Sequence, residues 1–223
     1  DVIVDFDATE AGRFVGLGLL GVARFFLINN GSYARDFDTP EQLGLNPYMN
    51  MFFYPGPARP RVCRRASLFD AVVPSNLMLV HYLPDGPQVS LDNSLASLVL
   101  GGNGLWGDLP ALSEEVVRFW RDNLADYKRV ANAVNFAYPR TRGFIGSSPE
   151  IHEKINSEAG AGLVAFFTVA PGTYSYLTQP LDLEKLGEIK GADEWEATED
   201  GCLKLTVSLP ADGARTVFIL PKG

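Results

Sequence analysis

The spacing of apolar segments changes once along this 223-residue chain, near residue 135. Before that point, short apolar runs alternate with helical stretches, which is typical of parallel βαβ units. After it, short strand-like runs follow one another with turn residues between them. We therefore predict an α/β part over residues 1–138 and an antiparallel β-sandwich over residues 139–223.

The first apolar run, over residues 2–7, ends in a group of carboxylates. Asp5 and Asp7 are two residues apart, so a strand places both on one side, and Glu10 follows shortly after. In barrels and open α/β sheets the active site lies at the carboxyl ends of the strands. These acids are therefore the best candidates for acid, base or nucleophilic chemistry. The alternative is structural, with Asp7 or Thr9 capping the next helix.

Further strands and one long helix are expected in the first part of the chain. The strands are predicted at residues 23–31, 49–54 and 76–83. Residues 94–100 are either a short helix followed by a strand or a strand themselves. The longest helix is predicted from Ser113, its N-cap, to about residue 133, with an apolar face formed by Val116, Phe119, Trp120, Leu124 and Tyr127.

The second part is expected to begin with a short helix over residues 149–156, because Ser147-Ser148-Pro149-Glu150 resembles a capping box. Strands are then predicted at residues 162–169, 173–177, 194–198, 202–209 and 215–220. Gly172, Asp200-Gly201 and Asp212-Gly213 are turn signals between these strands.

Composition excludes several classes of function. The net charge of -8 argues against nucleic-acid binding, and the absence of any run of 18 apolar residues argues against a membrane-spanning helix. Cys63 and Cys202 are too few for a disulfide framework or a metal set, and no metal or cofactor is expected. They do not fix the compartment, and a secreted or periplasmic location is compatible with the sequence. Because the chain starts inside a strand and without Met, we expect a fragmentary N-terminus.

The order of motifs between residues 98 and 128 resembles the last barrel strand and last barrel helix of α-galactosidase-like (clan D) glycoside hydrolases. The matching residues are Leu98–Gly104, then Asp108, Leu112–Glu115 and Asp126–Lys128, and residues 162–169 are similar to that group's first sandwich strand. The resemblance covers the whole chain in order. It implies the C-terminal part of a (β/α)8 TIM-type barrel followed by a β-sandwich, and hydrolysis of a glycosidic bond through a carboxylate pair.

The resemblance also implies roles for residues near the start of the chain. Phe6-Asp7 matches the aromatic–aspartate pair that ends the family's fourth barrel strand, which implies that Asp7 is the nucleophile. Asp5 stands where the family commonly has a substrate-binding lysine. Asn29 and Asn30 fall at the end of the fifth strand, where substrate-facing polar residues are expected.

Two further residues suit a sugar site from their own chemistry. Tyr33 and His81 lie near predicted strand ends, where an aromatic or polar side chain can contact a carbohydrate. For each of them, packing or a structural hydrogen bond is the alternative.

The expected position of the general acid, at the end of the sixth strand, carries no carboxylate over residues 53–59. Either Asp36 or Asp38 supplies the acid from a neighbouring loop, or the barrel has lost its chemistry and the protein is a non-catalytic carbohydrate-binding or scaffold protein. A barrel usually needs about 250 residues. We therefore expect another chain segment or protomer to complete it.

Overall fold

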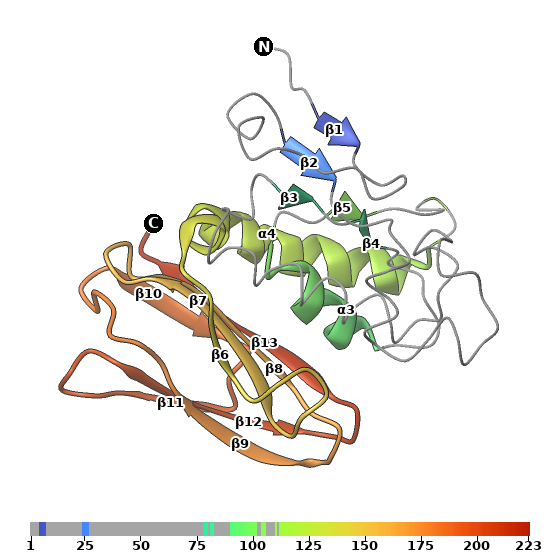
Figure 1. The fold of residues 1–223 in the computed structure, drawn as a ribbon. Helices are drawn as coiled ribbons and strands as arrows, with labels where there is room; N and C mark the ends of the chain where they lie inside the picture. Colours follow the sequence, from blue (N-terminus) through green and yellow to red (C-terminus); the bar gives the residue numbers. More distant parts are fainter. Residues whose placement is uncertain are drawn as a thin grey trace.

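The computed structural model describes residues 90–101, 110 and 112–223, and, for the remainder, the backbone of five short strands within residues 5–105. Figure 1 shows three regions, with the short strands on one side, two helices in the middle and a β-sandwich on the other side. Among the described residues, no helix is long and apolar enough to cross a membrane.

The five short strands pair in parallel. Strands β1 (Asp5–Asp7), β2 (Arg24–Phe26) and β3 (Met78–Leu79) form one sheet in that order, and β4 (His81–Tyr82) pairs with β5 (Gly104–Leu105). Predicted strands at the start of the chain and at residues 23–31 and 76–83 are thus confirmed at these positions. The predicted strand at residues 49–54 lies outside the described residues, and β2 pairs directly with β1 and β3.

Parallel pairing in the expected places agrees with an α/β part. In the five described strands, however, no closed barrel is formed, so the (β/α)8 barrel stays a prediction.

Two helices lie between these strands and the sandwich. Helix α3 (Leu91–Leu98) begins at Ser90, whose hydroxyl accepts a hydrogen bond from the Asn93 backbone N–H, and this settles the alternatives for residues 94–100 in favour of a helix. Helix α4 (Glu114–Phe136) begins at Ser113 as predicted. Its apolar face packs on the sandwich: Trp120, Val130, Ala133 and Val134 are buried there, and the other four predicted face residues pack around them.

The larger sheet has the order β10-β13-β8-β7-β6, all antiparallel. Its strands are β6 (Arg140–Arg142), β7 (Glu150–Asn156), β8 (Ala161–Phe167), β10 (Leu186–Lys190) and β13 (Ala214–Pro221). One face of β8 and β13 packs against α3 and α4, and the other face packs against a second sheet. This sheet is therefore covered on both sides, which explains why every residue of β8 is buried.

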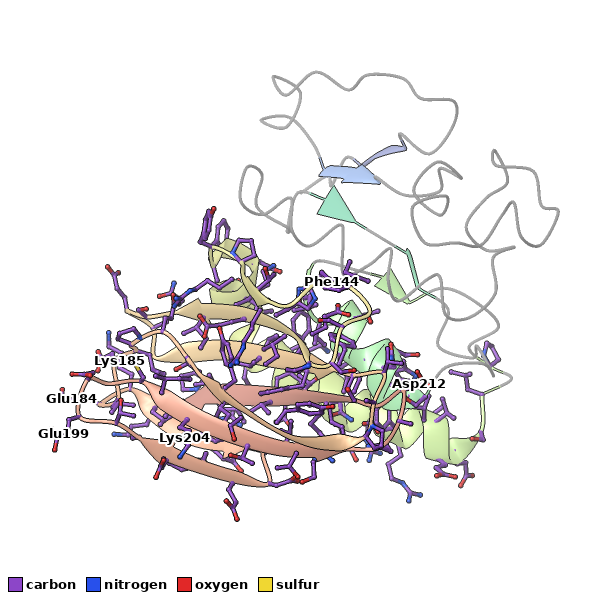
Figure 2. The ribbon with its side chains drawn as sticks, turned by 60° about the horizontal axis from the view of Figure 1, so that its bottom comes forward. Phe144, Glu184, Lys185, Glu199, Lys204 and Asp212 are labelled. Carbon is purple, nitrogen blue, oxygen red and sulfur yellow. The ribbon has the colours of Figure 1, made fainter. Side chains whose placement is uncertain are left out.

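The second sheet has the order β11-β12-β9 and closes the sandwich, with β9 (Gly172–Leu177), β11 (Glu194–Ala197) and β12 (Leu203–Leu209). Strand β12 alternates strictly: its four hydrophobic residues Leu203, Leu205, Val207 and Leu209 are buried, and the residues between them face outward. Figure 2 shows Lys204 on this outer face and Asp212 at the turn that leads into β13. The predicted strands of the sandwich are confirmed.

The predicted helix over residues 149–156 is wrong, because Glu150–Asn156 is strand β7. Ile151 and Ile155 are four residues apart, which fits a helix, but both also lie on the same face of a strand and pack between the two sheets. Pairing with β6 on one side and β8 on the other supplies the backbone hydrogen bonds of this segment. Tertiary pairing therefore overrides the local capping signal.

Candidate functional site

The predicted catalytic edge of the parallel strands is defined by backbone register. Asp7, the last residue of β1, pairs with Phe26 of β2, which in turn pairs with Leu79 of β3. His81 follows two residues after Leu79 on the same stretch of chain and pairs with Gly104. Two inter-strand spacings place Asp7 and Leu79 roughly 10 Å apart across this sheet, and His81 lies just beyond Leu79 in sequence, in the neighbouring pair β4–β5.

The other predicted site residues lie outside the described part of the chain. These are Asn29, Asn30, Tyr33, Asp36 and Asp38. For Asp5, Asp7 and His81 the structure gives the strand and the register, and their side chains are outside the description. The nucleophile and the general acid therefore stay predictions. The backbone supports one necessary condition, which is that Asp7 lies at the carboxyl end of a parallel strand.

A second group of chemistry-bearing residues lies on β7. Glu150, His152 and Lys154 alternate along one face of the strand, and we call them the buried polar row. Their exposed fractions are 2%, 4% and 1%. Glu and Lys are almost never buried to this degree unless they are paired. The row lies on the face of the larger sheet where α3 and α4 pack, because Lys154 pairs across the strands with Leu163 of that core.

Glu150 and His152 form a buried pair. His152 Nε2 lies 2.7 Å from Glu150 Oε1, and the Gly146 backbone N–H donates to Glu150 Oε2 at 2.9 Å. The imidazole ring packs edge-on against Phe167 with the ring centres 5.9 Å apart. Among the residues that the structure describes, His152 Nδ1 is buried without a hydrogen-bond partner.

Lys154 connects the sandwich to the end of helix α3. Its Nζ donates to the backbone carbonyl of Leu100 at 2.5 Å. Burial lowers the pKa of the Lys154 ammonium to about 7, because the charged form loses its hydration. From helix α4, the Tyr127 hydroxyl donates to the next carbonyl, that of Gly101, at 2.8 Å. Two side chains from two elements thus hold consecutive carbonyls.

The opposite face of β7 carries a fourth buried ionisable residue, Glu153. Its Oε2 accepts from the Gln179 backbone N–H at 3.0 Å, and its Oε1 lies 3.5 Å from Arg140 Nη1. Burial raises the pKa of the Glu153 carboxyl, and the Gln179 N–H, Arg140 and Tyr176 oppose that rise. Within the part of the chain that is described, no three His, Cys, Asp or Glu side chains come together to hold a metal ion.

The four ionisable residues of β7 were not among the predicted site residues, because the sequence pattern predicted a short helix over residues 149–156. The available signal was the length of the apolar run at residues 161–167, which is typical of a strand that is buried on both faces and needs partners on both edges.

The architecture defines a class of protein: parallel strands are followed by a long helix that packs on an antiparallel β-sandwich (Figure 1). Solved structures that share this fold are GH36 alpha-galactosidases. One, from Geobacillus stearothermophilus in complex with raffinose, is 19% identical with a TM-score of 0.50, and the match covers 70% of this chain and 24% of that chain. Another, the galactosidase domain of an alpha-galactosidase-sucrose kinase, is 14% identical with a TM-score of 0.52, covering 74% and 24%.

The chain therefore spans about a quarter of the length of these structures. The predicted resemblance to an α-galactosidase-like hydrolase is confirmed at the level of fold. No protein-family model matches the sequence, and no curated protein matches it.

Proposed function

We propose that this chain is the C-terminal part of the catalytic unit of an α-galactosidase-like glycoside hydrolase, which cleaves a glycosidic bond with Asp7 as nucleophile. The observation that supports it best is the place of Asp7, an aspartate at the carboxyl end of a strand in a set of parallel strands. The structural neighbour in complex with raffinose, a carbohydrate, supports the choice of an α-galactoside as substrate.

In this proposal the substrate binds at the carboxyl edge of the parallel strands. Asp7 attacks the anomeric carbon while the glycosidic C–O bond breaks, and Asp36 or Asp38 protonates the leaving oxygen. Water, deprotonated by the same acid residue, then cleaves the bond between the sugar and Asp7, which releases the sugar and restores both carboxyl groups. Asp5, Asn29, Asn30, Tyr33 and His81 bind the sugar. Retaining hydrolysis needs the two carboxyl groups about 5–5.5 Å apart. The barrel is completed by another chain segment or protomer, as the share of the neighbours' length that the chain covers suggests.

The alternative is a carbohydrate-binding protein without turnover, favoured by the lack of a carboxylate over residues 53–59. Hydrolysis of 4-nitrophenyl α-galactoside and calorimetric binding of galactose separate the two. We expect Asp7→Asn to lower kcat at least about 10³-fold while galactose still binds. Asp122→Asn, at an exposed aspartate of α4, is the matched control and should leave kcat unchanged.

Three results bear on the choice. Turnover that is equal in the wild type and Asp7→Asn removes Asp7 from the mechanism. Binding without turnover in the wild type favours the second function. If the protein with its completing segment present neither binds galactose nor hydrolyses the substrate, both proposed functions are overturned.

A further inference from the structure

The sequence at the corner between helix α3 and strand β5 is rich in glycine. After the helix, the sequence runs Leu100-Gly101-Gly102-Asn103-Gly104, with three glycines in five residues. Glycine restricts the backbone less than any other residue. The Gly101 backbone N–H makes one long local hydrogen bond, 3.5 Å to the Leu98 carbonyl, and contacts from outside the segment add to it.

Those contacts are the two described above. Leu100 has an exposed fraction of 0% and Gly101 is also buried, so their carbonyls are removed from water. A buried carbonyl without a partner is costly. Lys154 of β7 donates to the first carbonyl and Tyr127 of α4 donates to the second. Burial raises the pKa of the Tyr127 hydroxyl to about 12, so it keeps its proton and stays a donor.

The corner leads directly into the parallel strands. Gly104 begins β5, and its register partner on β4 is His81. Gly101 and Gly104 are three residues apart in sequence, and His81 is one of the residues that the proposed function assigns to sugar binding.

We propose that Lys154 and Tyr127 are positioning residues, which fix the corner Leu100–Gly101 and thereby the register of β5 against β4. Through them the sandwich sets the geometry of the sugar-binding edge. The effect on sugar binding rests on the proposed function, whereas the effect on the corner does not.

Hydrogen–deuterium exchange of the whole protein tests the proposal, with Lys154→Met and Tyr127→Phe as variants. Tyr127→Phe removes one hydroxyl and keeps the ring that packs on the core, so it remains informative if Lys154→Met folds poorly. The matched control is Lys185→Met: Lys185 also donates to a backbone carbonyl, that of Glu158, but its side chain is 57% exposed and lies at the end of the sandwich (Figure 2).

In both variants we expect amides at residues 100–105 to exchange five- to tenfold faster, with unchanged exchange in β8 and β13. The control should match the wild type throughout. Unchanged exchange at residues 100–105 in Tyr127→Phe, or an acceleration spread evenly over the sandwich, would overturn the proposal.

A kinetic measurement then tests the link to the site. Loss of positioning at a substrate-binding residue should raise KM for 4-nitrophenyl α-galactoside at least fivefold, with kcat within twofold of the wild type. Local acceleration of exchange with unchanged KM would overturn the link to the sugar edge. A wild type that does not turn over would refute the proposed function, and the exchange result would still decide whether the corner is held in this way.

Discussion

The burial of Lys154 has a consequence for stability that can be calculated. The pKa of its ammonium is about 7 in the folded protein, and 10.5 is the ordinary value. Between these two pH values the unfolded chain binds a proton that the folded chain does not hold, so the free energy of unfolding rises with pH. At about 1.4 kcal/mol per pH unit, and with partial titration near pH 7 included, the gain from pH 7 to pH 9.5 is about 3 kcal/mol.

Replacement of Lys154 by Met removes this titration and keeps a side chain of similar length. We therefore expect the difference in unfolding free energy, wild type minus Lys154→Met, to rise by about 3 kcal/mol between pH 7 and pH 9.5. Urea denaturation followed by circular dichroism measures it at each pH. Tyrosine ionisation, which begins at about pH 9.5, affects both proteins alike and cancels in the difference. Lys185→Met, at an exposed lysine, is the control and should show no such rise.

The reasoning fails if the two proteins differ by an amount that does not change with pH. A rise of less than about 1 kcal/mol over this range would mean that Lys154 keeps its hydration or has a charged partner that compensates for burial.

Three other predictions concern the sandwich. Leu205→Ala removes a fully buried side chain between the sheets and should lower the unfolding free energy by about 2–5 kcal/mol, whereas Thr206→Ala, next to it on the outer side of β12, should change it by less than about 1 kcal/mol in the same urea experiment. Gly191→Ala should lower the melting temperature far more than Gly146→Ala does. Both glycines have positive φ angles, 94° at Gly191 and 91° at Gly146, so the backbone strain is similar. A Cβ at Gly191 would lie 2.1 Å from the Thr216 carbonyl oxygen, whereas a Cβ at Gly146 would meet nothing within 4 Å. Equal melting temperatures would contradict this. Because burial raises the pKa of Glu153, its ionised form destabilises the folded state above the ordinary titration range. Glu153→Gln should therefore gain stability relative to the wild type as the pH rises from 4 to 7, and a constant difference would refute that explanation.

Local sequence signals were sufficient to predict the helices and strands whose structure depends mainly on their own residues. Helix α4 is predicted by its Ser113 cap and the spacing of its apolar residues, and β12 by a strand-like run that follows the Asp200-Gly201 turn signal. Strand β10 was missed because Leu186–Lys190 is an edge strand with Gly187 and Glu188 inside it, which breaks the alternation.

The prediction for residues 149–156, where strand β7 lies, was wrong for a different reason. Both faces of this strand are buried, so its ionisable residues and its isoleucines do not differ in burial. Only pairing with distant segments decides such a strand, and a local pattern does not contain that information. The sequence predicted Asp7 at a strand end, where the structure has it, because that position depends on a local pattern. It left Asp36 and Asp38 as alternatives for the proposed general acid, because a local pattern does not contain the contacts between distant segments.

The most direct test of the central claim is to identify the nucleophile itself. A retaining glycosidase forms a covalent glycosyl-enzyme intermediate. An activated 2-deoxy-2-fluoro-galactoside, whose intermediate hydrolyses slowly, should add the mass of one sugar to the protein, and peptide mapping by mass spectrometry locates it. The account predicts a single label on Asp7 that is absent in Asp7→Asn. A label on another carboxylate, or no label on a protein that hydrolyses α-galactosides, would contradict it.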